Sequence, residues 1–98
     1  MQYEISPQPP KLGRVKVTLS FIDRHHVPLR GAHLKLEGDM SHPGMAPVFG
    51  DVAETKPGRY EGSLNFSMAG DWVMIVRGTL ADGERLEREV SLPGVRPD

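Results

Sequence analysis

The chain has 98 residues, a net charge of -1 and a hydrophobic content of 38%, which together are typical of a single globular domain. Lys and Arg are scattered singly along the sequence, and the lack of a basic patch argues against nucleic acid as a partner. The chain contains no cysteine, which excludes disulfides, thiol catalysis and thiolate metal sites. Any bound metal must therefore be held by His, Met, Asp or Glu.

The start of the chain is polar and contains Pro7, Pro9 and Pro10, a composition typical of an extended linker. We expect residues 1–12 to form this linker, residues 13–93 the folded domain and residues 94–98 a C-terminal tail. No stretch has the charged and then apolar pattern of a signal peptide, and no apolar run approaches the roughly 20 residues that span a bilayer. We therefore expect no membrane insertion by this chain, with any tether in a segment that it lacks.

Alternating apolar and polar residues predict the first two strands. Residues 14–21 alternate strictly, so their apolar positions share one buried face. Residues 32–37 follow the same pattern, with Leu34 and Leu36 inward and His33 outward. Each segment is therefore predicted to form a strand with one buried face and one solvated face.

A glycine interrupts the third predicted strand. Residues 48–53 form this strand, in which Gly50 predicts a bulge. The sequence Lys56-Pro57-Gly58 then predicts a turn.

The second half of the chain continues the same β pattern. Residues 60–66 alternate, and residues 72–76 are apolar on both parities, which is typical of a central strand covered on both sides. Asp82-Gly83 predicts a hairpin, and the last strand runs to about Leu92. A seventh strand would come from the proline-rich start or from residues 23–31. We therefore predict an all-β, immunoglobulin-like antiparallel β-sandwich of about seven strands.

The loop between Asp39 and Pro47 concentrates donors that soft metals prefer. Its Met40 and Met45 carry thioethers on either side of the imidazole of His42. Met and His without thiolate suit Cu(I), while the imidazole also suits Cu(II). The Pro-Gly pair between His42 and Met45 favours a type II turn, which would bring the Cα atoms of these two residues within about 7 Å. Both side chains would then reach one ion.

Strand direction adds Met68 to this candidate site. In an antiparallel sandwich each connection reverses the chain, so the connections after the second and fourth predicted strands emerge at the same end. The alternative is structural, because Met40, Met45 and Met68 would also serve as flexible apolar caps on the open end of a sandwich, with His42 solvated beside them.

The other histidines and the remaining methionine have simpler explanations. Met74 lies in an apolar run and is predicted to be core. His25 and His26 fall in a turn region at the opposite end, and His33 is expected to be exposed. The sequence has no nucleophile elbow, P-loop, zinc-protease motif or dinucleotide fingerprint, so we expect no enzyme activity.

Several short motifs, in their order and spacing, resemble the YtkA-like and FixH family of small extracytoplasmic β-domains. The resemblance covers about residues 11–92. The matching pieces are Pro28-Leu29-x-Gly31-Ala32, the Met/His loop, Gly58-Arg59-Tyr60-x-Gly62 and Phe66-x-Met68-x-Gly70-x-Trp72.

This resemblance implies an exported or membrane-anchored protein that handles copper. It implies a periplasmic or extracytoplasmic location, and a membrane copper transporter or an oxidase assembly protein as the partner. It also implies metal ligands at Met40, His42, Met45 and Met68. From these expectations follow two hypotheses, a Cu(I) chaperone or accessory domain and a metal-free protein-interaction module of a membrane assembly.

Overall fold

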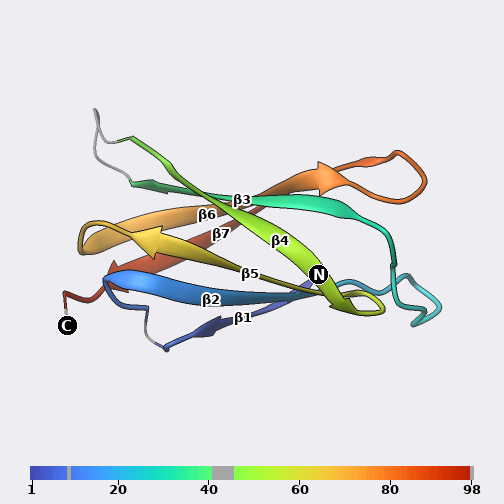
Figure 1. Cartoon of the computed structure of the whole chain (residues 1–98), viewed down its shortest axis with the longest axis horizontal. Helices are drawn as coiled ribbons and strands as arrows, with labels where there is room; N and C mark the ends of the chain where they lie inside the picture. The colour runs from blue at the N-terminus through green and yellow to red at the C-terminus, as the bar shows by residue number, and fades with distance from the viewer. Residues whose placement is uncertain (9, 41–45, 98) are drawn as a thin grey trace.

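The structure is a computed structural model that describes residues 1–8, 10–40 and 46–97. These residues form seven β-strands and no helix, and so contain no helix that could cross a membrane. The strands follow one another as drawn in Figure 1: β1 (Gln2–Ser6), β2 (Gly13–Ser20), β3 (His33–Met40), β4 (Val48–Lys56), β5 (Arg59–Phe66), β6 (Gly70–Thr79) and β7 (Arg85–Val95).

All paired strands run antiparallel, in the order β1-β2-β5-β4-β3-β6-β7. Strand β4 joins the two layers, because its first half pairs with β3 and its second half pairs with β5. Figure 1 shows β4 crossing diagonally from one layer to the other. The sheet therefore curls into two facing layers, and the predicted all-β, sandwich-like single domain is confirmed.

Two glycines allow β4 to change partners. A Cβ atom on Gly50 would overlap the backbone oxygen of Ser63, and a Cβ atom on Gly62 would press on the backbone oxygen of Asp51. The bare backbones of β4 and β5 approach each other closely here, as glycine permits. The predicted bulge at Gly50 is wrong, since the register shifts between Glu54 and Lys56, and Gly50 instead permits the close approach.

The hydrophobic core lies between the two layers, where the alternating apolar residues of β2, β3 and β5 are buried as predicted, together with Leu86, Val90 and Leu92 of β7. Trp72 and Phe66 pack in its interior with ring centroids 4.9 Å apart. Strand β6 is a central strand, as its two-sided apolar pattern predicted, because it pairs with both β3 and β7. Met74 is fully buried in the core, whereas Ile75 on the other parity is 6% exposed and pairs in register with Glu37.

Both ends of the chain join the sheet. Residues 2–6, expected as part of a linker, form β1 and pair with β2, and Ile5 is 3% exposed. At the other end β7 extends to Val95, which is buried, and Leu12 donates a backbone hydrogen bond to Arg96. The structure thus differs from the expected boundaries because isolated apolar residues, Ile5 and Val95, fill the core beside the prolines.

The segment before β3 is held by one buried tyrosine. The hydroxyl of Tyr60 donates a hydrogen bond of 2.7 Å to the backbone oxygen of Leu29 and accepts one of 3.1 Å from the backbone N–H of Ala32. Between them Gly31 has a φ of 74°, a left-handed conformation that glycine adopts readily. The Pro-Leu-x-Gly-Ala sequence is therefore the partner of Tyr60.

Replacing Tyr60 with phenylalanine should destabilise the domain by about 1–3 kcal/mol, because it leaves two backbone groups without their partner. Urea denaturation of Tyr60→Phe measures this loss. Tyr3→Phe is the matched control, since Tyr3 is 44% exposed. Equal stability of the two variants would contradict the role of the Tyr60 hydroxyl.

Candidate functional site

Met40 ends β3 at the predicted metal loop. It pairs in register with Trp72 of β6, is partly buried and packs against the core. A Cβ atom on Gly70 would lie 3.1 Å from the Met40 Cε, so this side chain lies against the β5–β6 turn. His42 and Met45 lie outside the described residues, and their part in the site stays a prediction.

Met68 lies in that same β5–β6 turn. Its side chain is 46% exposed, while its backbone oxygen accepts a 2.9 Å hydrogen bond from the Trp72 indole. The contact of Met40 with Gly70, two residues after Met68, shows that the two connections emerge at one end of the domain, as strand direction predicted. Figure 1 shows this end at the left.

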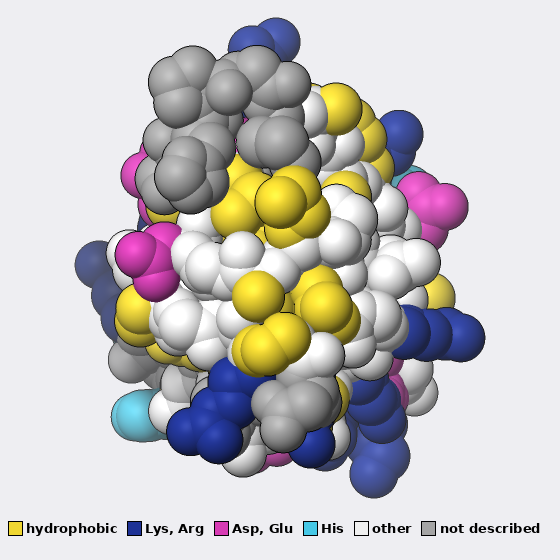
Figure 2. Space-filling model, turned by 90° about the vertical axis from the view of Figure 1, so that its left-hand side faces the viewer, with side chains coloured by type: hydrophobic (Ala, Val, Ile, Leu, Met, Phe, Trp, Pro, Cys, Tyr) yellow, Lys and Arg dark blue, Asp and Glu magenta, His cyan; other side chains and the backbone are white. Residues whose placement is uncertain are grey.

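The end that carries Met40 and Met68 is partly apolar at its surface. Figure 2 shows this end, with hydrophobic side chains gathered near the centre of the view. Leu12, which is 39% exposed, precedes Gly13, and Gly13 pairs with Phe66 just before the Met68 turn. The exposed Leu12 and Met68 side chains therefore both contribute apolar surface at this end.

The soft donors among the described residues at this end are thioethers. Methionine sulfur binds soft cations such as Cu(I) and loses no proton on doing so. Among the described residues, His, Asp and Glu form no group of three that could hold a metal ion. A partly buried thioether and an exposed one on adjoining elements suit a soft cation that exchanges with a second molecule.

Two carboxyl groups precede Met40 along β3. A hydrogen bond with Asp39, followed by burial and the charge of Asp39, raises the pKa of Glu37 above its ordinary value of 4.5, while Arg77 works in the opposite direction. The Arg77 Nη1 lies 2.5 Å from Glu37 Oε1. Because the pKa is raised, the contribution of Glu37 to stability is present below that ordinary value and is lost as the pH rises through the raised pKa.

Removing Asp39 should lower the pKa of Glu37, because the hydrogen bond and the negative charge that favour the protonated form both disappear. Side-chain carboxyl NMR of Asp39→Ala across a pH series measures this shift. Asp51→Ala is the control, since Asp51 is an exposed carboxylate of the neighbouring strand that does not contribute to the shift. An unmoved Glu37 pKa in Asp39→Ala would contradict the coupling.

The remaining histidines lie apart from this end. His25 and His26 are exposed in the connection between β2 and β3, at the opposite end of the domain, and the backbone N–H of His25 donates to Asp23. His33 is exposed at the start of β3, as predicted. The core prediction for Met74 is confirmed by its complete burial.

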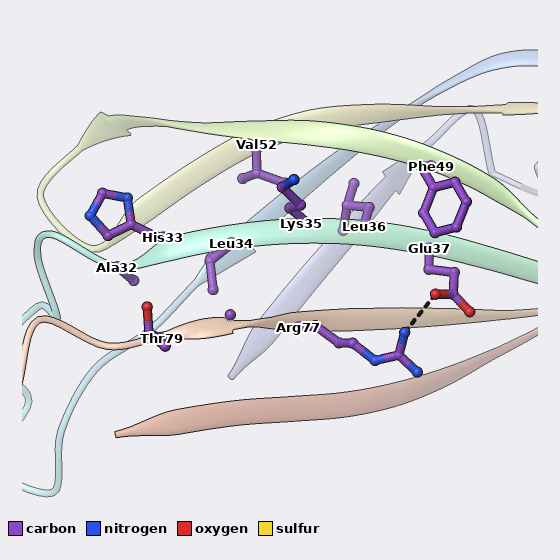
Figure 3. A pocket seen from close by; sticks show the side chains of 11 residues that line it. Ala32, His33, Leu34, Lys35, Leu36, Glu37, Phe49, Val52, Arg77 and Thr79 are labelled. Atoms are coloured by element: carbon purple, nitrogen blue, oxygen red, sulfur yellow. Dashed lines mark hydrogen bonds and ion pairs between the residues drawn. The ribbon is translucent and has the colours of Figure 1, made fainter. Parts of the chain in front are cut away.

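A groove between β3 and β4 is a second feature, one that sequence reasoning missed. It has a volume of about 470 Å³ and is lined by Leu34, Leu36 and Val52 together with more polar neighbours. Figure 3 shows Phe49 beside Glu37 at one end of the groove and His33 at the other. Phe49 is 68% exposed, and its parity, opposite to Val48 and Val52, was the signal for an outward aromatic.

Together these features define a small β-domain with two methionine side chains, Met40 and Met68, at one end. A model of the YtkA-like family matches residues 1–77, and the chain belongs to this family. The predicted family is thereby confirmed, and its grouping with FixH is consistent with the match. Comparison with curated proteins and with solved structures gave no match.

Proposed function

We propose that this chain is an extracytoplasmic copper-binding domain that holds Cu(I) through Met40, His42, Met45 and Met68. The observation that carries the proposal is the placement of Met40 beside the turn that bears Met68, at one open end of the domain. Thioether sulfur is a soft donor matched to Cu(I), and the imidazole adds a donor that also tolerates Cu(II).

The exposure of the two described methionines supports a carrier rather than a permanent metal site. Met40 packs against the core, so it is a fixed ligand, whereas Met68 is 46% exposed and within reach of a second molecule. A partner ligand would then replace Met68 before Met40 in a stepwise exchange. This is non-enzymatic transfer, and it needs no proton loss from either sulfur.

The ligand set supports an extracytoplasmic location. Free thiols tend to pair in oxidising compartments, whereas Met and His ligands persist there, and this chain contains no cysteine. The resemblance to the YtkA-like and FixH family suggests a membrane copper transporter or an oxidase assembly protein as the partner. Copper would then pass from this domain to that protein as cargo.

Anaerobic Cu(I) titration followed by methionine methyl NMR tests the proposal. We expect saturation at one equivalent, with shifts at Met40, Met45 and Met68 and in the backbone around His42. The methyl of Met74 is the internal control, because this residue is fully buried in the core. Met74→Leu should therefore bind Cu(I) like the parent, and the lack of any response at stoichiometric Cu(I) would overturn the proposal.

The affinity for Cu(I) should depend on pH through His42. An imidazole binds metal only when neutral, and an ordinary histidine has a pKa near 6.5, so affinity should fall as the pH drops below about 6.5. Competition with a Cu(I) chelator at several pH values measures this. In His42→Ala the dependence should vanish and leave a weaker, pH-independent affinity. A flat profile in the parent chain would exclude His42 as a ligand.

The groove beside Phe49 favours a second candidate function, a metal-free protein-interaction module of a membrane assembly. Its apolar lining and exposed aromatic are typical of contact surfaces. The two candidates separate in one comparison. Met40→Ala, His42→Ala and Met45→Ala combined should abolish Cu(I) binding under the first, and Phe49→Ser should abolish partner binding under the second.

A further inference from the structure

The indole of Trp72 connects the core to the turn that bears Met68. Trp72 is 1% exposed and packs on Phe66, with an angle of 52° between the ring planes. Its Nε1–H donates a 2.9 Å hydrogen bond to the backbone oxygen of Met68. A buried indole N–H needs such a partner. Here the partner is the backbone oxygen of Met68, whose side chain is exposed.

The same tryptophan also lies beside Met40. Trp72 is the register partner of Met40 across β3 and β6. Between Trp72 and Met68 the chain passes through Gly70, whose φ of 132° favours glycine. A Cβ atom at Gly70 would meet the end of the Met40 side chain at 3.1 Å. The Trp72 indole therefore holds the backbone of Met68, two residues before the glycine against which the Met40 side chain lies.

We infer that Trp72 is a positioning residue that holds the Met68 thioether beside that of Met40. This inference rests on the proposed Cu(I) site but adds a residue that does not itself bind the ion. A turn fixed in advance reduces the ordering that metal binding must otherwise impose, and groups that orient ligands raise metal affinity. The apolar core thus sets the ligand geometry at the surface.

The test replaces Trp72 with benzothienylalanine, which keeps the shape of indole but carries sulfur in place of the N–H. Cu(I) affinity is measured by chelator competition in the parent chain and in Met68→Leu. We expect the replacement to weaken binding about fivefold, the effect of one lost hydrogen bond. In Met68→Leu the same replacement should change affinity by less than about twofold, because the turn then carries no thioether to position.

Phe66→Leu is the matched packing control. It disturbs the ring that packs on Trp72 but leaves the indole N–H and the Met68 carbonyl in place. We expect it to lower stability while Cu(I) affinity remains within about twofold of the parent. A fivefold loss in this variant, or an equal loss on Trp72 replacement with and without Met68, would overturn the inference in favour of general loosening.

The metal-free domain separates this inference from the proposed function. The methyl groups of Met40 and Met68 should show a nuclear Overhauser effect in the parent chain, and it should weaken when Trp72 is replaced by benzothienylalanine. Lack of Cu(I) binding with this result would sink the copper proposal and leave the positioning role standing. Absence of the effect in the parent, or an unchanged effect on replacement, would overturn the positioning role itself.

Discussion

The change of partner along β4 is the constraint on which the two-layer fold depends. Its first residues extend the β3–β6–β7 layer and its last residues extend the β1–β2–β5 layer. The crossing brings backbone against backbone, and Gly50 and Gly62 leave the necessary space. Without it, the two apolar faces would belong to separate sheets with no strand to hold them in register. The same divergence of β4 from β3 opens the groove beside Phe49.

The fold also determines which end of the domain carries the thioethers. Because β3 and β6 run antiparallel, the end of β3 meets the start of β6, and Met40 comes opposite Trp72. The β5–β6 turn is then the neighbour of Met40, whatever residues it contains. Tyr60 performs a related task at the other end, where its hydroxyl holds the segment that enters β3. Two buried aromatics with one polar atom each thus fix both ends of the same strand layer.

Period-two patterns predicted the strands well because burial on one face is a local property of sequence. Val15, Leu34 and Leu64 are buried as their parity requires. The close approach of two backbones depends on a strand that is distant in sequence, and for this reason the sequence around Gly50 predicted a bulge instead. Strand β1 was predicted only as one of two alternatives for the seventh strand, since a single inward residue, Ile5, gives too little periodicity beside three prolines.

The candidate site was predictable only in part, and the physical reason lies in what each methionine does. Met74 and Met68 belong to the same residue type and lie six positions apart, yet one is fully buried and the other is 46% exposed. Their neighbours in the sequence distinguish the two residues, since Met74 lies within the apolar run of residues 72–76 and Met68 lies just after the fourth predicted strand. The support of Met68 by Trp72 is different, because it depends on a hydrogen bond between a core side chain and a turn carbonyl. Such a bond leaves no pattern of hydrophobicity, so the residue that organises the thioethers emerges only from the three-dimensional structure.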